Sequence, residues 1–218
     1  MKTRVHSAKG RPIASTRWLE RQLNDPYVQR ARREGFRARS VYKLAEIDGE
    51  HGLLRAGARI VDLGAAPGSW SQYAAKRGCR VLGLDLLEVQ PIPGVELLQG
   101  DFLDPAVQAQ VVERLGGPVD LVLSDMAASS TGSRAVDRLR AEGLGEAVLE
   151  FAGRVLAPGG ACLIKLVRGA EAALQARARP AFRSLKLLRP PATRADSSEI
   201  FLLALGHRPG EHAGAGEG

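Results

Sequence analysis

Val61-Asp62-Leu63-Gly64-Ala65-Ala66-Pro67-Gly68-Ser69-Trp70 is the stretch of sequence that decides the fold. Apolar residues on both sides of Asp62 predict a buried parallel strand, and the glycines after it predict a tight turn into a helix. Gly64 and Gly68 stand four residues apart, unlike the closely spaced glycines of the G-x-G-x-x-G loop that holds a pyrophosphate. Because glycine lets a ligand approach the backbone, the loop favours a nucleoside cofactor without phosphates, with S-adenosylmethionine as the leading candidate. The alternative is a strand-to-helix turn that binds no ligand.

From residue 59 onward, strands and helices are predicted to alternate along the chain. Short apolar runs predict strands at 59–63, 80–85, 95–99, 119–124, 160–167, 184–189 and 199–205. Helices are predicted near 69–77, 105–115, 136–157 and 170–180. This alternation is typical of an α/β fold, with about seven strands in a mostly parallel sheet and helices on both faces. The last two strands are too close in sequence for a crossover helix, so we expect the final strand to pair antiparallel.

The composition indicates one folded domain. The chain has 218 residues, of which 44% are hydrophobic and 25% charged, as in globular proteins. It has no run of about 18 apolar residues and no apolar signal core at its start, so we expect a cytoplasmic protein that does not contact a membrane. Cys79 and Cys162 lie in apparent strand regions, at the edge of one predicted strand and inside another, without metal-ligand spacing, which favours buried free thiols and no metal site.

Positive charge is concentrated at the N-terminal end. Residues 1–43 contain twelve Lys or Arg against three Asp or Glu, whereas the remaining residues carry a small negative excess. This asymmetry predicts an arm that binds a polyanion, and a solvated tail is the alternative. The residues expected to contact the phosphates of such a partner are Arg30, Arg32, Arg33, Arg37 and Arg39.

The domain boundaries follow from the same patterns. Residues 1–14 are expected to be a basic mobile tail, residues 15–206 a single domain, and residues 207–218 a disordered end. Within the domain, residues 15–58 form a basic helical segment. One helix is predicted to start near Ser15 or Thr16 and a second near Ser40. The first is expected to turn Trp18, Leu19, Leu23 and Val28 inward.

Acidic residues end three predicted strands at what would be one edge of the sheet. Asp62 lies in the first strand, Asp85 closes the second, and Asp101 follows the third. Ligands of open parallel sheets bind outside the carboxyl ends of the strands. Asp85 is suited to accept hydrogen bonds from ribose hydroxyls, and Asp101 to hold an adenine amino group. A helix cap or a turn explains any one of these acids, but three on one edge favour a cofactor site.

Asp125 and Lys165 are predicted to extend the same edge. Asp125 ends the strand 119–124, and Lys165 lies inside the apolar run 162–167. Burial disfavours the charged form of a lysine, so a lysine inside an apolar strand favours a functional role. The alternative is a lysine on an edge strand that extends its amine to solvent.

With these residues in place, the chain resembles the FtsJ/RrmJ-like ribosomal RNA large-subunit 2′-O-methyltransferases, called RlmE in bacteria. The resemblance extends from about Ser15 to Gly206. It rests on Ser15-Thr16-Arg17-Trp18-Leu19, Asp25-Pro26-Tyr27-Val28, Arg37-Ala38-Arg39-Ser40 with Lys43-Leu44, residues 61–73 (VDLGAAPGSWSQY), Leu98-Gln99-Gly100-Asp101-Phe102, Ser124-Asp125-Met126-Ala127, Leu156-Ala157-Pro158-Gly159-Gly160, Lys165 and Ser198-Glu199.

The resemblance implies a Rossmann-like class I methyltransferase fold and an enzyme that uses S-adenosylmethionine to methylate a ribose 2′-hydroxyl. The implied substrate is a uridine of 23S ribosomal RNA, in the A-loop of the peptidyl transferase centre of the large (50S) subunit or its late precursor. We expect a monomer. The implied catalytic group is Lys43, Asp125, Lys165 and Glu199. The implied cofactor contacts are Gly68, Trp70, Asp85, Asp101 and Asp125.

Two places depart from the family pattern. Ala128 and Ser129 stand where members usually carry Pro and Asn, and Ser198 stands where they usually carry Arg. All three are expected to border the RNA side of the pocket, so the details of substrate contact are where this chain differs.

A mechanism follows from the four implied catalytic residues. A ribose hydroxyl is a weak acid, and a lysine acts as its general base only where a neighbouring cation or a desolvated site lowers the lysine pKa. The hypothesis is that Lys165 is the base and that Asp125 orients the reacting groups near the methyl group. Lys43 and Glu199 would support the ribose and the lysine.

Four alternatives stay open at this point. A transfer RNA 2′-O-methyltransferase would carry the same catalytic residues. A catalytically weak, RNA-binding ribosome-assembly factor of this fold would be expected to lack a catalytic lysine or a glycine of the loop, and neither is missing. The basic N-terminal segment disfavours a small-molecule methyltransferase, and the missing third glycine disfavours a nicotinamide dehydrogenase.

Overall fold

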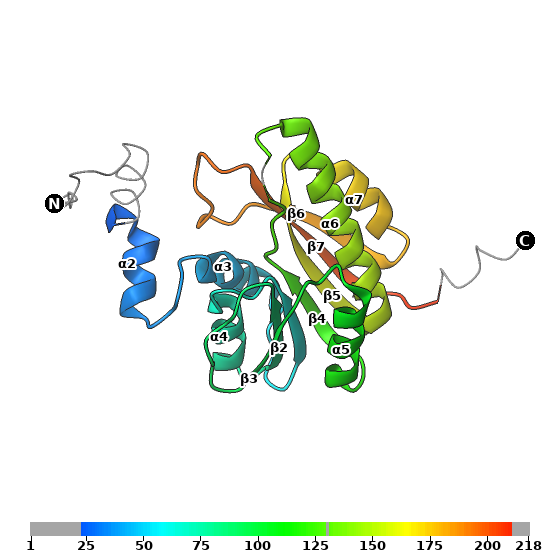
Figure 1. The fold of residues 1–218 in the computed structure, drawn as a ribbon, viewed down its shortest axis with the longest axis horizontal. Helices are drawn as coiled ribbons and strands as arrows, with labels where there is room; N and C mark the ends of the chain where they lie inside the picture. The colour runs from blue at the N-terminus through cyan, green and yellow to red at the C-terminus, as the bar shows by residue number, and fades with distance from the viewer. Residues whose placement is uncertain (1–22, 130, 211–218) are drawn as a thin grey trace, which may run out of the picture.

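The structure is a computed structural model that describes residues 23–129 and 131–210, and its centre is a seven-stranded sheet (Figure 1). The strands are β1 (Arg59–Leu63), β2 (Arg80–Asp85), β3 (Val95–Gln99), β4 (Val119–Ser124), β5 (Leu156–Val167), β6 (Phe182–Leu188) and β7 (Glu199–His207). They lie in the order β3-β2-β1-β4-β5-β7-β6. The first five pair in parallel, and β7 pairs antiparallel with both β5 and β6. The α/β class, the strand number and the antiparallel last strand are therefore confirmed.

Helices cover both faces of the sheet, as Figure 1 shows. One face carries α3 (Val41–His51) and α4 (Ser69–Lys76), and the other carries α5 (Pro105–Leu115), α6 (Arg134–Val155) and α7 (Glu171–Ala178). Each face has its own apolar core. Trp70 of α4 packs on Phe201 of β7 in one core, and Phe102 packs edge-on against Phe151 of α6 in the other.

Four of the predicted strands have the predicted bounds, and the differences lie in the last three. β5 begins at Leu156, four residues earlier than expected. β6 and β7 are shifted or extended because Phe182 pairs with His207 across the two strands, with their rings 5.5 Å apart. His207 is buried, so the sheet includes the first residue of the segment expected to be a disordered end.

The N-terminal helix differs from its prediction. A separate helix α2 (Pro26–Arg33) begins after Asp25, whose carboxylate accepts hydrogen bonds from the backbone N–H of Tyr27 and of Val28. An aspartate cap followed by proline starts a new helix and cannot lie inside one. A single helix carrying both Leu23 and Val28 is therefore wrong. Its predicted start at Ser15 or Thr16, with Trp18 and Leu19, lies outside the described residues, as do the tail 1–14 and residues 211–218.

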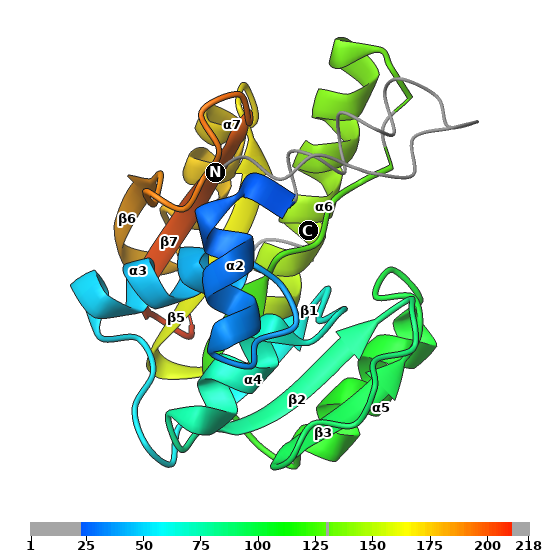
Figure 2. The ribbon, with the colours of Figure 1, turned by 90° about the vertical axis from the view of Figure 1, so that its left-hand side faces the viewer.

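Helix α2 lies against α3 (Figure 2). Ala31 is buried with Tyr42 of α3 and Ala192 of the β6–β7 loop. The Asp25 carboxylate also forms ion pairs with Arg39, at 3.1 Å, and with Arg194, at 3.0 Å. These contacts fix the N-terminal segment against the end of the sheet where β7 begins. Within the part of the chain that the structure describes, no helix is both long and apolar enough to cross a membrane.

Candidate active site

A cavity of about 670 Å³ opens at the carboxyl ends of β1, β2 and β4. Its lining includes the three predicted acids Asp85, Asp101 and Asp125. Asp85 accepts hydrogen bonds from the backbone N–H of Ala66 and of Leu87, both at 2.8 Å, so its carboxylate is held at the edge of the glycine loop. Apolar side chains complete the lining: Leu84, Leu86, Leu87, Phe102, Leu103, Met126 and Leu144. We call this space the donor cavity.

Gly64 permits the close approach of the loop that follows β4. Its φ is +77°, and a Cβ added there would lie 2.7 Å from Met126 Cγ and 2.8 Å from Met126 N. The neighbouring Asp125 N–H donates to the Leu63 carbonyl at 3.1 Å. A side chain at position 64 would push this loop away from β1, so the glycine places Asp125 and Met126 at the cavity wall.

Asp62 lies beneath the glycine loop and is completely buried. The Ser71 hydroxyl donates to its carboxylate at 2.6 Å, which ties the first turn of α4 to β1. Burial raises the pKa of Asp62 to about 7, although the hydrogen bond from Ser71 acts in the opposite direction. Asp62 does not line the donor cavity, so its role is to hold the loop from behind.

Gly68 and Trp70, which the resemblance assigns to the cofactor, do not line the donor cavity. Gly68 has a φ of +109°, and a Cβ there would lie 2.6 Å from Ile92 Cδ1 and 2.8 Å from Arg37 Nη1. The Trp70 indole is buried and donates to the Ser40 carbonyl at 2.9 Å. In the structure these residues shape the loop and its support, and direct cofactor contact by either stays a prediction.

The four predicted catalytic residues come from four separate elements and form two ion pairs. In the inner pair, Lys165 Nζ of β5 lies 3.0 Å from Asp125 Oδ1, and it also donates to the Asp125 carbonyl. In the outer pair, Lys43 Nζ of α3 lies 2.6 Å from Glu199 Oε2 at the start of β7. Both lysine side chains are about 12% exposed, so their amines lie below the protein surface.

The two carboxylates respond differently to this environment. Burial raises the pKa of Asp125, and the positive charges of Lys165 and Lys43 offset only part of the effect. Burial alone would also raise the pKa of Glu199. The hydrogen bond and charge of Lys43, with the charge of Lys165, outweigh it and leave the Glu199 pKa below its usual value. The Lys43 amine therefore holds its partner as a carboxylate more firmly than the Lys165 amine does.

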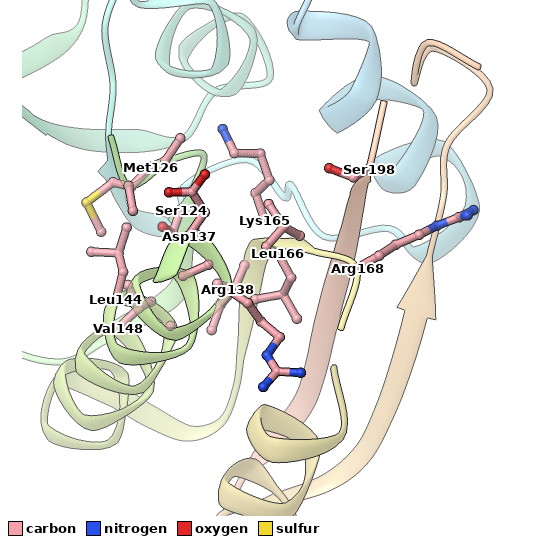
Figure 3. Close-up of a pocket in the computed structure, with 16 residues that line it drawn as sticks. Ser124, Met126, Asp137, Arg138, Leu144, Val148, Lys165, Leu166, Arg168 and Ser198 are labelled. Carbon is pink, nitrogen blue, oxygen red and sulfur yellow. The ribbon is translucent and has the colours of Figure 1, made fainter. Parts of the chain in front are cut away.

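Lys165 also lines a second cavity, of about 550 Å³, between α6 and the end of β5 (Figure 3). We call it the acceptor-side cavity. Asp85 and Asp101 are not part of its wall. The two cavities share four lining residues: Met126, Ala127, Ala128 and Leu144. Lys165 and Asp137 point toward one end of this cavity in Figure 3, and Arg138 points the other way.

The positions that depart from the family pattern lie at these cavities. Ala128 lines both of them, Ser129 lines the donor cavity, and Ser198 lines the acceptor-side cavity. The cavity between α6 and β5 was not predicted from the sequence. Its wall combines residues from distant segments, and no local pattern marks them.

The arginines predicted to bind RNA fall into two groups. Arg30, Arg32 and Arg33 are exposed on α2, with Arg30 paired to Glu34 at 2.7 Å. Arg39 is ion-paired with Asp25 and donates to the Ala192 carbonyl. The fifth, Arg37, is held by main-chain carbonyls.

Arg37 joins three segments of the chain. Its guanidinium donates to the carbonyls of Pro67, Gln90 and Pro91, each at 2.8 Å. The backbone N–H of Arg37 donates to Oε1 of Gln72 at 3.0 Å. The structure thus gives Arg37 intramolecular partners at the glycine loop, a role that sequence reasoning missed because the partners are backbone carbonyls far away in sequence.

Comparisons with known proteins agree with this geometry. The sequence profile described as FtsJ-like methyltransferase matches residues 36–207. "Ribosomal RNA large subunit methyltransferase E" of Gluconobacter oxydans is 50% identical, over 94% of this chain and 77% of that protein. The protein of the same name from Acidiphilium cryptum is 48% identical, over 94% of this chain and 92% of that protein.

A solved structure of a protein described as a ribosomal RNA methyltransferase has a similar fold. A Plasmodium falciparum protein described as a ribosomal RNA methyltransferase matches with a TM-score of 0.71 and 26% sequence identity, covering 79% of this chain and 98% of that one. The family profile covers both ion pairs and the donor cavity. This chain belongs to the FtsJ-like methyltransferase family.

Proposed function

We propose that this protein transfers a methyl group from S-adenosylmethionine to the ribose 2′-hydroxyl of a uridine in 23S ribosomal RNA. The observation that carries the proposal is the convergence of Lys43, Asp125, Lys165 and Glu199 beside the donor cavity. The names of the relatives, which refer to the large ribosomal subunit, support the choice of RNA. A monomeric, cytoplasmic protein whose residues 15–206 act as one domain is part of the same proposal.

The donor cavity fits S-adenosylmethionine by its chemistry. Asp85 and Asp101 offer carboxylates for ribose hydroxyls and for an adenine amino group, and the leucines beside them offer an apolar surface for the base. Arg140 is the only Lys or Arg among the described residues that line it, and it donates to the Ser129 carbonyl. A nucleoside without phosphates suits such a lining better than a dinucleotide does. When bound, S-adenosylmethionine supplies an electrophilic methyl group on a sulfonium.

Lys165 is the residue best placed to accept the proton of the ribose hydroxyl. The carboxylate and carbonyl of Asp125 aim its amine, and Asp125 itself lines the donor cavity. In-line transfer depends on this orientation as much as on the proton acceptor. Lys43 is fixed by Glu199, so its positive charge stays near the site without occupying the place of the base.

The exposed arginines of α2 supply RNA affinity in this proposal. Arg30, Arg32 and Arg33 are on the surface of a helix that packs beside Tyr42, next in sequence to Lys43. Contacts with phosphates add affinity and salt dependence more than sequence choice. Arg37 and Arg39 already have intramolecular partners, and Arg30 is paired with Glu34, so we assign the phosphate contacts first to Arg32 and Arg33.

The decisive experiment measures transfer of tritiated methyl groups from S-adenosylmethionine. The acceptors are large ribosomal subunits from a strain that lacks the modification, and bulk transfer RNA serves as the comparison. We expect 2′-O-methyluridine in 23S RNA with the wild-type protein and a loss of about 1,000-fold in the rate of its formation with Lys165→Met. Labelling of transfer RNA instead would replace the proposed substrate. Binding to subunits without any labelling would favour an assembly factor.

A further inference from the structure

We propose that the acceptor-side cavity holds the base of the target nucleotide, rotated out of the RNA stack, while its ribose lies at Lys165. The inference rests on the proposed function and adds to it the place and conformation of the acceptor. Its starting observation is that Lys165 lines this cavity and not the donor cavity. The proposed proton acceptor therefore faces a different cavity from the one that Asp85 and Asp101 line.

The depth of the reacting groups requires the target nucleotide to be turned out of any stack to which it belongs. The side chains of Lys165 and Asp125 are only 12% and 20% exposed, so a hydroxyl in the groove of a stacked duplex lies too far away. Enzymes that modify nucleotides solve this problem by turning the target nucleotide out of the stack into a pocket. The base is attached to the carbon next to the one that carries the 2′-hydroxyl. It must therefore lie within a few ångströms of Lys165.

The cavity has the size and lining that a base needs. Its volume of about 550 Å³ is within the range of small-molecule sites. Met126, Leu144, Val148 and Leu166 give it an apolar lining, on which the flat face of a base packs. Arg168 and Ser198 line it as well and are exposed. They leave the cavity open to solvent on the side where the rest of the RNA must remain.

Helix α6 lines both cavities, but with different residues, and this difference can be tested. Ala141 lines the acceptor-side cavity, and Gly143 lines the donor cavity. A Cβ at Gly143 would meet nothing within 4 Å, so a larger side chain there extends into open space. One bulky residue, placed at either position, should therefore fill either cavity on the same helix.

The first test is Ala141→Phe, with Ala135→Phe as the matched control. Ala135 is exposed on α6 and lines neither cavity. We expect Ala141→Phe to lower kcat/KM for unmodified large subunits by about 100-fold, the scale of a misplaced acceptor. Its Kd for S-adenosylmethionine, measured by calorimetry, should equal that of the wild type. Ala135→Phe should match the wild type in both measurements.

The corresponding variant on the donor side is Gly143→Phe. It should weaken S-adenosylmethionine binding by about tenfold or more, because one aromatic ring occupies part of the donor cavity. Its KM for subunits at saturating donor should stay near the wild-type value. A second bulky change on the acceptor side, Ser198→Phe, enters the acceptor-side cavity from the loop before β7 and should repeat the Ala141→Phe result.

A substrate without the base separates this inference from a general distortion of the site. Large-subunit RNA is assembled with an abasic ribose at the target position. Ala141→Phe should methylate this RNA as fast as the wild type does, since no base competes with the ring. Equal loss on the abasic and the complete RNA would overturn the inference, and so would normal activity of Ala141→Phe on complete subunits. Absence of transfer by the wild type to complete, unmodified subunits would instead contradict the proposed function.

Discussion

The two lysine–carboxylate pairs of the site contain the same residue types but belong to different regions of the molecule. The inner pair, Lys165 and Asp125, joins neighbouring strands at the meeting point of two cavities. The outer pair, Lys43 and Glu199, joins a helix of the N-terminal segment to the start of β7. Burial raises the pKa of Asp125 despite the nearby lysines, whereas at Glu199 the hydrogen bonds and lysine charges together outweigh burial and lower the pKa. Position therefore distinguishes two pairs of the same residue types: in the proposed function the inner pair faces the reacting atoms, and the outer pair holds the segment proposed to bind RNA.

The largest expected effect comes from removing each lysine in turn. Lys165→Met should lower the single-turnover rate of methyl transfer by about 1,000-fold, because general base catalysis is lost. Lys43→Met should lower it by about tenfold, the scale of one lost charge-assisted hydrogen bond. Both rates are measured at saturating donor, with the Kd for S-adenosylmethionine as the control. Equal losses would remove the distinction between the two pairs.

The next effect concerns the surface that the outer pair secures. Replacing Arg32 and Arg33 with Gln should raise KM for subunits by about tenfold and flatten its dependence on salt, because two phosphate contacts are lost. Arg177 and Arg179, exposed near the end of α7, give the matched double Gln control. If the double variant of Arg177 and Arg179 has the same effect, α2 contributes to RNA binding only through its positive charge and not through specific phosphate contacts.

Arg37 tests whether the N-terminal segment acts on RNA alone. Arg37→Ala should weaken S-adenosylmethionine binding about fivefold even without RNA, because the carbonyls of Pro67, Gln90 and Pro91 lose their shared donor. Arg37→Lys should not restore the affinity, since a single ammonium lacks the fork of a guanidinium. Arg33→Ala is the control and should bind the donor normally. A defect of Arg37→Ala seen only with RNA would make Arg37 a phosphate ligand.

The smallest expected effect is a difference of sign in the pH dependence of stability. The Glu199 pKa is lowered by folding, so its stabilisation is present above its usual value of 4.5 and is lost as the pH falls through the lowered value. The Asp125 pKa is raised, so its ionisation costs stability as the pH rises above 3.8.

Chemical denaturation from pH 3 to pH 7 measures this difference with Glu199→Gln and Asp125→Asn. The wild type should gain stability over Glu199→Gln with rising pH and lose it relative to Asp125→Asn. Loss of a partner for Lys165 shifts the second curve by a constant amount and leaves its slope unchanged. Slopes of the same sign would mean that the two carboxylates share one environment.

The sequence predicted most of the sheet because its signals are local. Short apolar runs located β1 to β4 residue for residue, and the short link between β6 and β7 required an antiparallel pair. The same strand ends brought Asp85, Asp101 and Asp125 to one cavity. Periodicity failed at Asp25, where a cap and a proline separate two helical stretches that read as one.

The parts that the sequence could not predict depend on contacts across long separations. Arg37 and Arg39 look like RNA-binding residues in a basic run, yet their partners are carbonyls and a carboxylate that only the folded chain brings near. The acceptor-side cavity is built by α6, β5 and Ser198, which share no motif. Charge and spacing in the sequence indicate which residues could bind RNA. Only the fold decides whether each of these side chains faces solvent or another part of the protein.

The carboxylate of Asp25 has a consequence for how this protein can be re-engineered. It caps α2 and pairs with Arg39 and with Arg194, which is 169 residues further along the chain. The position of the basic N-terminal segment therefore depends on a residue of the β6–β7 loop, and the segment cannot be exchanged by itself. A transplant of this segment into a relative should keep its position only if the recipient supplies an arginine at the place of Arg194, so these three residues must be exchanged together.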